Sequence, residues 1–297
     1  MSSPRGGSFA LALGGAMTAV SSAALVILLA QPLPPSVIAA GRVAVTGGAL
    51  MVVGTRAWPS AWAALRTGDV RWRVLAAAVL LAVHFGTWVT SLTMTSVARS
   101  VTLVATQPLF AGLLAWLGGQ RVPRSWWAGA VVAIAGTVVM VSEDGPLGGG
   151  FGIGDGLALI AAAAATGYFM IGRSVRSMVP LRPYLGLVHL VAAAILAGLA
   201  WVMEPVPFPA SATGLDWLAL VYLGLVPGLV GHGLLNWAVR QIPVYVVSLV
   251  ILLEPVGATL LTLGVLGRSV TPAEALGGGI LLVGVALGIP RRQAEPT

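Results

Sequence analysis

The sequence contains no cysteine and no lysine, and only 8% of its 297 residues are charged. Without cysteine, disulfide bonds and thiolate metal sites are excluded. The three histidines have no further ligands at suitable spacing for a zinc site, so we expect neither a metal nor another cofactor. The HExxH, GxSxG and P-loop motifs are also missing from the sequence, which argues against an enzyme and against a built-in ATP motor.

Hydrophobic residues make up 58% of the chain. Soluble domains carry roughly 25% charged residues, far more than this chain does. Apolar stretches near the roughly 20-residue length that spans a bilayer recur from end to end. We therefore predict an all-α polytopic membrane protein with ten transmembrane helices. The expected helices cover residues 8–30, 35–55, 72–93, 97–118, 124–142, 152–172, 183–203, 216–237, 243–265 and 272–290.

The formal net charge of +7 comes from arginines that lie mostly between the apolar spans. Such a distribution indicates membrane topology, so we expect a lipid bilayer and no nucleic acid as partner. The loops predicted on one side carry Arg5, Arg56, Arg66, Arg71, Arg73, Arg121, Arg124, Arg173, Arg176, Arg182, Arg240, Arg291 and Arg292. The other side carries Glu143, Asp144, Asp155, Glu204, Asp216 and Glu274, with Arg268 as its clear basic loop residue. By the positive-inside rule, both termini face the cytoplasm of a cell whose inner membrane holds the protein.

Tryptophans cluster at the predicted helix ends, where amphipathic rings prefer the membrane interface. They are Trp58, Trp62, Trp72, Trp126, Trp127, Trp201 and Trp217. We expect these residues to anchor the helices rather than to contact a ligand.

One hydrophobic segment occurs twice, at residues 96–141 and 243–288, with a polar residue and a proline in the middle of each copy. The central pairs are Gln107-Pro108 and Glu254-Pro255, 147 positions apart. The same alignment, with one inserted residue before the glycines, matches Val97 with Val244, Arg121 with Arg268, Gly129 with Gly277 and Gly136 with Gly284. A polar side chain beside a proline halfway through an apolar span is typical of transporters that bind solute at the bilayer midplane.

The Gly/Pro-rich stretch at residues 143–154 separates five expected helices from five more. Because five is odd, the second half enters the membrane with the opposite orientation. We predict two inverted five-helix repeats, residues 1–145 and 146–297, around a central cavity.

Glu254 is the acidic side chain least able to reach water, about eleven residues or on the order of 16 Å into its helix. It binds a substrate amine or carries protons in one interpretation, and forms a hydrogen bond to backbone freed by Pro255 in the other. Its mate Gln107 is neutral and cannot carry protons in the same way.

His84 and Trp88 lie four residues apart on one expected helix, and His232 and Asn236 lie four apart on the corresponding helix of the second half. We predict that these four side chains, with Gln107 and Glu254, line the cavity. Because a solvated histidine titrates near neutral pH, the two histidines make coupling of transport to protons possible. Aromatic walls are expected from Tyr168, with Trp116, Tyr245 and Trp237 as further candidates. Ordinary helix packing is the alternative for each of them.

Arg42 and Arg99 lie in expected helices toward the acidic side. Arg42 either snorkels outward, as residues near helix ends commonly do, or faces the cavity. In the second case one of the two arginines attracts a substrate carboxylate or pairs with Glu254.

Several short motifs together resemble one family. They are Ala39-Ala40-Gly41-Arg42, Thr95 to Arg99 running into Gln107-Pro108-Leu109-Phe110, Gly119-Gln120-Arg121, Asn236-Trp237, Glu254-Pro255-Val256 and Gly267-Arg268. The chain is similar to members of the drug/metabolite transporter superfamily, in the EamA-type group of ten helices and two five-helix repeats. Such proteins usually carry an acidic residue where this chain has Gln120 and Gly267, which argues against a charge pair there.

The resemblance implies secondary transport and points to the amino-acid exporter branch, which includes aromatic amino-acid exporters. A multidrug or other metabolite carrier is the alternative within transport, and a scaffold or receptor without transport is the alternative outside it. The expected partner is a small solute. The exact substrate, the coupling ion, the net direction and the oligomeric state are left open by the sequence.

Overall fold

The computed structural model describes residues 6–29, 33–53, 55–142, 150–204 and 209–289. Arg5, Glu143, Asp144, Arg291, Arg292 and most of the predicted 143–154 linker lie outside the described residues. The elements in chain order are α1 (Gly6–Leu29), α2 (Pro35–Val53), η1 (Thr55–Ala57), α3 (Trp58–Leu65), α4 (Gly68–Met94), α5 (Val97–Val104), α6 (Gln107–Leu117), α7 (Arg124–Met140), α8 (Ile153–Val175), α9 (Leu181–Met203), α10 (Gly214–Leu223), the π-helix η2 (Gly224–His232), α11 (Gly233–Gln241), α12 (Val244–Ile251), α13 (Glu254–Leu266) and α14 (Pro272–Gly288).

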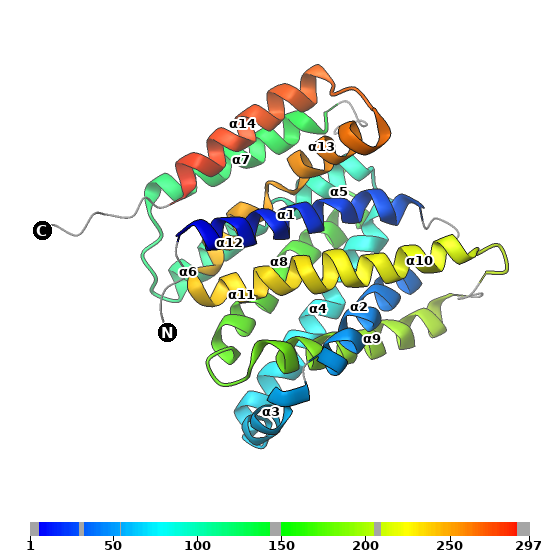
Figure 1. Cartoon of the computed structure of the whole chain (residues 1–297). Coiled ribbons are helices and arrows are strands. Elements are labelled where there is room, and N and C mark those ends of the chain that lie inside the picture. The colour runs from blue at the N-terminus through cyan, green and yellow to red at the C-terminus, as the bar shows by residue number, and fades with distance from the viewer. Residues whose placement is uncertain (1–5, 30–32, 54, 143–149, 205–208, 290–297) are drawn as a thin grey trace, which may run out of the picture.

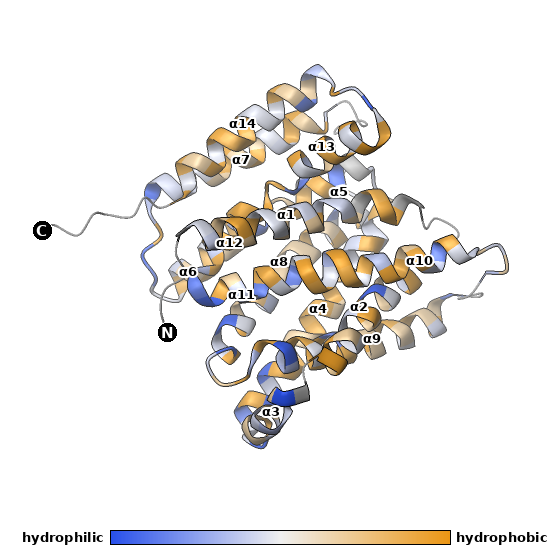
Figure 2. Ribbon diagram, in the orientation of Figure 1, coloured by the Kyte–Doolittle hydropathy of each residue, from blue (hydrophilic) through white to orange (hydrophobic). Residues whose placement is uncertain are grey.

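All ten predicted spans are present, and the described residues contain no strand. Eight helical segments are long and apolar enough to cross a membrane, and the apolar helices α7 and α14 have 17 residues each. Figure 2 shows that hydrophobic residues dominate the middle of the helices. The short helix α3 was not predicted, because its eight residues are fewer than the pattern of a spanning helix requires.

Two spans are broken where the repeat alignment predicts. One is divided between α5 and α6 and the other between α12 and α13, and Pro108 and Pro255 each lie one residue inside the second half-helix. Proline has no N–H, so a carbonyl in the preceding turn loses its helical donor. The Thr166 hydroxyl donates to the Gln107 carbonyl at 3.2 Å beside the first break.

A third irregularity was not predicted. Residues Gly224–His232 form a π-helix around Pro227, and the Thr46 hydroxyl of α2 donates to the Gly224 carbonyl at 2.7 Å. The equivalent helix of the first half, α4, is continuous over its 27 residues. The two halves therefore differ in local geometry although they share an overall plan.

Corresponding helices of the two halves run antiparallel. Helices α7 and α14 lie side by side (Figure 1), with Gly129 opposite Gly284 and Gly136 opposite Gly277. The same holds for α2 and α9, where Gly47 faces Leu190 and Gly186 faces Leu50. A two-fold axis along the membrane normal would make equivalent helices parallel, whereas an axis in the membrane plane makes them antiparallel. The predicted inversion of the repeats is confirmed.

The remaining helix contacts obey the same exchange. Helix α4 of the first half packs on α8 of the second half. Its repeat equivalent in the second half, η2, packs in the same way on α1 of the first half. Likewise α5 and α6 pack on α8, while α13 packs on α1. The core is therefore formed between the halves, and the space where they meet is central.

The two ends of the helix bundle differ in charge. We call one the arginine-rich end, with Arg56, Arg66, Arg71, Arg73, Arg121, Arg124, Arg173, Arg176, Arg182 and Arg240. We call the other the acidic end, with Asp155, Glu204, Asp216 and Glu274. Trp62, Trp72 and Trp201 are exposed near helix ends, as expected of interface anchors. Trp126 of α7 is fully buried and packs against α6 and α12, so the anchor assignment is wrong for this residue.

Two glycines of α14 provide a test of the α7–α14 contact. A Cβ added at Gly277 would overlap backbone atoms of Gly136 and Met140, whereas a Cβ at the exposed Gly279 meets nothing within 4 Å. We expect Gly277→Ala to destabilise the protein by about 1–3 kcal/mol, because backbone cannot move aside as a side chain can. Gly279→Ala should leave stability unchanged or slightly raise it. Thermal unfolding in detergent, followed by size-exclusion chromatography, measures both, and equal melting temperatures would contradict this close packing of α7 on α14.

Candidate functional site

A cavity of about 480 Å³ lies between the two halves of the chain. It is lined by residues of α1, α2, α4, α5, α6, α7, α8, η2, α11, α12, α13 and α14. It extends to the acidic end, where Arg268 and Glu274 border it and form an ion pair at 3.3 Å. The two helix breaks therefore border a space that reaches one surface of the molecule.

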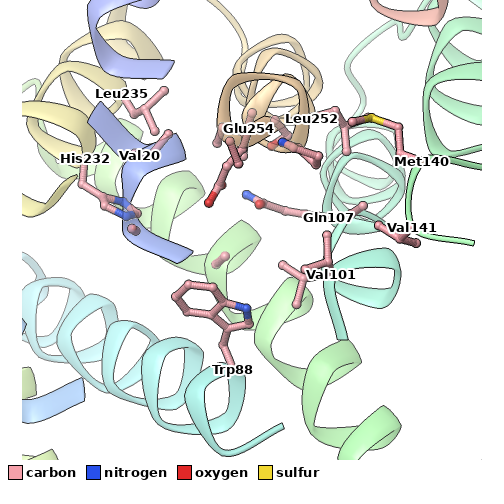
Figure 3. Close-up of a pocket in the computed structure, with 18 of the residues that line it drawn as sticks. Val20, Trp88, Val101, Gln107, Met140, Val141, His232, Leu235, Leu252 and Glu254 are labelled. Carbon is pink, nitrogen blue, oxygen red and sulfur yellow. The ribbon is translucent and has the colours of Figure 1, made fainter. Parts of the chain in front are cut away.

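Gln107 and Glu254 are the first residues of the half-helices α6 and α13. Figure 3 shows their side chains pointing toward one another across the cavity. The Nε2 atom of Gln107 is buried and finds no hydrogen-bond partner among the described residues. A helix N-terminus carries a partial positive charge, which stabilises the Glu254 carboxylate. The repeat thus places an amide and a carboxylate opposite each other.

Arg42 of α2 is only 2% exposed and borders the same cavity. Its guanidinium carbon lies 4.4 Å from the centroid of the Phe85 ring and 5.8 Å from that of Trp88. The snorkelling alternative is therefore wrong: α2 packs against α4, α9 and η2, and aromatic faces receive the charge inside the protein.

Arg42 and Glu254 form a separated pair of opposite charges. They interact through space, but the ion pairs within 4.0 Å in the described chain do not include them. The Nη1 atom of Arg42 is buried and has no hydrogen-bond partner in the part of the chain that the structure describes. Burying a charge without partners is costly, so this donor is available for a bound group.

The two predicted histidines, His84 and His232, both contact Phe85. His84 Nδ1 donates to the Ala161 carbonyl at 2.9 Å, and its ring lies parallel to that of Trp88. His232 contacts Phe85 edge to face at 5.4 Å. His84, Trp88, His232, Gln107 and Glu254 all border the cavity. Their role in binding a solute stays a prediction.

Tyr168 and Asn236 lie apart from this group. The Tyr168 and Tyr184 hydroxyls and Asn236 Oδ1 are buried on the arginine-rich side of the cavity and do not line it. Phe169 borders the cavity instead of Tyr168, since Ala165 and Phe169 share one face of α8, spaced four apart. Neither Phe85 nor Phe169 was predicted to line the cavity, although both do. Phe85 lines it together with the predicted His84, and the pattern of α8 by itself does not distinguish Phe169 from Tyr168.

The further aromatic candidates lie outside the cavity lining. Trp116 is exposed, Trp237 packs on Phe9, and Tyr245 packs on Trp126. His189 was not singled out from the sequence; it is buried in α9, and its Nδ1 donates to the Leu185 carbonyl of its own helix at 2.8 Å.

Arg99 is engaged at the acidic end. It donates to both carboxylate oxygens of Asp155, at 3.1 Å from Nε and 2.5 Å from Nη2, and Thr95 also donates to that carboxylate. Arg99 therefore joins α5 to α8 in this structure and does not pair with Glu254.

Each half of the chain matches the same known family. Residues 6–142 and, separately, residues 152–289 match the EamA-like transporter family. The chain belongs to this family. As an EamA-like transporter it has a small-molecule substrate and membrane lipid as its surroundings.

Two further similarities agree with the family assignment. "Uncharacterized transporter YwfM" of Bacillus subtilis (strain 168) is 27% identical over 224 residues, which is 74% of each protein. A solved crystal structure resembles the fold of this EamA-like transporter with a TM-score of 0.79 and 23% identity, covering 95% of this chain and 96% of the other. The latter establishes the fold alone.

Two arginine–aspartate pairs, one partly buried at the acidic end and one exposed at the arginine-rich end, provide a test of the Arg99 link. The side chains of Arg99 and Asp155 are 17% and 3% exposed, whereas those of Arg73 and Asp69 are 45% and 69% exposed. We expect Arg99→Gln to cost about 1.5 kcal/mol or more in stability, because Asp155 would lose charged hydrogen bonds in a buried position. Arg73→Gln should cost less than about 0.5 kcal/mol. Chemical or thermal unfolding of the two variants compares them directly, and a smaller loss for Arg99→Gln would show that Arg99 does not hold α5 against α8.

Proposed function

We propose that the protein is a secondary transporter that exports small metabolites across the inner membrane by alternating access, with amino acids, aromatic and hydrophobic ones included, as its solutes. One observation carries the proposal: a single cavity presents a buried cation, Arg42, and a carboxylate, Glu254, among apolar and aromatic walls. The amino-acid class rests on this chemistry.

The separation of the two charges suits a zwitterion. Because Arg42 and Glu254 do not touch, a solute between them has room to present a carboxylate to one and an ammonium group to the other. The unpartnered Nη1 of Arg42 supplies a donor for the carboxylate. Charge-assisted hydrogen bonds of this kind are stronger than neutral ones, which supports recognition of the backbone of an amino acid.

The walls suit an apolar or aromatic side chain. Phe85, Trp88 and Phe169 border the cavity together with aliphatic residues of α5 and α12. Its volume of about 480 Å³ lies within the roughly 300–1,000 Å³ of pockets that bind small ligands.

The cavity reaches one end of the helix bundle and is closed toward the other, which supports alternating access. The cavity reaches the acidic end, where α13, all of whose residues are described, contains no buried residue. At the other end, residues 244–250 of α12 are all buried. With the arginine-rich end in the cytoplasm, by the positive-inside rule, this conformation faces outward and both termini are cytoplasmic. The repeats, residues 1–145 and 146–297, are the units that rock.

The direct test uses proteoliposomes that contain the purified chain. We expect saturable counterflow of labelled phenylalanine, tryptophan and leucine, with a pH gradient added in a parallel set to decide proton coupling. Empty liposomes and a heat-inactivated preparation are the controls. Absence of counterflow for every amino acid, with folded protein present in the vesicles, would overturn the amino-acid assignment.

Two charge-removing variants test the zwitterion arrangement. Arg42→Gln and Glu254→Gln should each lower phenylalanine counterflow roughly tenfold or more, because each removes a charged partner of the solute. Arg66→Gln, an exposed position at the arginine-rich end, is the matched control and should behave like the unaltered protein. If Glu254→Gln retains most activity, Glu254 supports the backbone near Pro255 and does not bind solute.

Competing solutes that carry only one of the two charged groups of an amino acid test Arg42 and Glu254 separately. Phenethylamine has no carboxylate, so its competition with phenylalanine should depend on Glu254 and be insensitive to Arg42→Gln. Phenylpropionate has no amine and should show the reverse dependence.

A second candidate within the family is a carrier of hydrophobic cations. Glu254 in a partly aromatic cavity favours it, while the buried charge of Arg42 opposes it. Strong transport of several unrelated lipophilic cations without amino-acid counterflow would select this function.

A further inference from the structure

A second, smaller cavity of about 260 Å³ lies toward the arginine-rich end, between α6, α8 and α12. It is lined by Ala111, Ala115, Gln120, Met170, Arg173, Ser174 and Val244. None of these residues borders the large cavity.

The repeat relates this small cavity to the mouth of the large one. Ala111 and Ala115 correspond to Ala258 and Thr262, both 147 positions later. Arg173 corresponds to Leu25, because the first helices of the halves align at an offset of 148. These three mates, Ala258, Thr262 and Leu25, all line the large cavity. Three of the seven residues that line the small cavity thus have repeat equivalents in the large one, so under exchange of the two repeats the small cavity overlaps the position of the open mouth.

One buried residue beside the small cavity differs in kind from its repeat equivalent at the open mouth. Trp126 does not line the small cavity but packs on Gly112 and Tyr245, which are the chain neighbours of the lining residues Ala111 and Val244. Trp126 is completely buried and contacts Tyr245 edge to face at 5.2 Å. Its mate, 148 positions later, is Glu274, which borders the open mouth and pairs with Arg268. A large buried ring thus stands where the other end has a mouth-lining carboxylate.

Arg173 adds a link between helices. Its Nη1 donates to the carbonyls of Val239 and Ile242, at the C-terminal end of α11. Helix C-terminal carbonyls carry partial negative charge, so a guanidinium stabilises them there. Leu25, the mate at the open end, has no hydrogen-bonding group to form such a link. Arg173 therefore joins α8 to the α11–α12 connection only at the closed end.

We propose that the small cavity is the closed mouth of the solute pathway at the arginine-rich end, and that Arg173 keeps it closed by binding the end of α11. This inference rests on the alternating access proposed above. When this mouth opens, the Arg173 guanidinium leaves the carbonyls and lines the entrance with Gln120 and Ser174. The entrance then presents a cation and two neutral polar groups, which suits a solute that carries a carboxylate.

The absence of native cysteine makes the test direct, since an introduced cysteine is the one thiol in the chain. Ala115→Cys reports on the small cavity, and Thr262→Cys reports on its mate at the open mouth. Each is placed in the full-length protein in lipid nanodiscs, where both faces meet solvent, and reacted with a polar maleimide. We expect Thr262→Cys to react quickly and Ala115→Cys slowly.

Removing the Arg173 link should reverse this preference. In the Arg173→Leu background we expect the labelling rate of Ala115→Cys to rise roughly tenfold or more and that of Thr262→Cys to fall, because the open and closed ends exchange. Arg182→Leu is the matched control: Arg182 lies at the same end and donates to the Val53 carbonyl at 3.4 Å, but it is exposed and does not line the small cavity. It should leave both rates unchanged.

The outcomes that overturn the proposal are distinct from those that overturn the transport function. Rapid labelling of Ala115→Cys in the unaltered background would show that the small cavity is not a closed mouth. Unchanged rates in a folded Arg173→Leu protein would show that Arg173 does not hold it closed. No solute is used, so loss of amino-acid counterflow in proteoliposomes leaves this result unaffected. If Arg173→Leu does not fold, Arg173→Gln, which keeps a donor, should give a smaller increase in Ala115→Cys labelling, and no increase would overturn the proposal.

Discussion

The missing N–H of two prolines is the constraint around which the rest of the structure is arranged. In an apolar span, a carbonyl without its helical donor must find another partner, so a proline there is tolerated only where protein groups or a cavity receive the backbone. Pro108 and Pro255 end the continuous helices at equivalent depths and let new half-helices begin at Gln107 and Glu254. The polar side chains are thereby turned toward each other and toward the cavity (Figure 3).

Charge burial then gives the cavity its chemical character. Arg42 lies inside the protein against Phe85 and Trp88, where the ring faces offset part of the cost of desolvation. Glu254 lies on the opposite helix and interacts with Arg42 without touching it. The low dielectric of such an interior strengthens both charges toward any group that enters between them. A cavity of this kind selects solutes by charge separation as well as by size.

Much of the architecture could be predicted from the residue pattern alone. Apolar runs near the spanning length predicted ten helices, and all ten are present, because backbone in a bilayer has to satisfy its hydrogen bonds within helices. The α7–α14 contact was not predicted, although its glycines were aligned by the repeat: Gly129 matches Gly277 and Gly136 matches Gly284 in sequence, whereas in the structure Gly129 lies opposite Gly284 and Gly136 opposite Gly277. The π-helix around Pro227 and the short helix α3 were missed because neither alters the overall hydrophobic run.

The helices, their inverted repetition and the residues at the two breaks could all be predicted from the residue pattern, since they follow from composition, length and proline chemistry. Which side chains share the cavity depends instead on how the helices pack in three dimensions. A rotation of about 100° per residue separates Phe169, at the cavity, from Tyr168, buried beside Asn236, and no pattern within α8 alone specifies which face meets the other half. The direction of Arg42 and the burial of Trp126 were decided in the same way, by the surfaces of neighbouring helices that are distant in the chain.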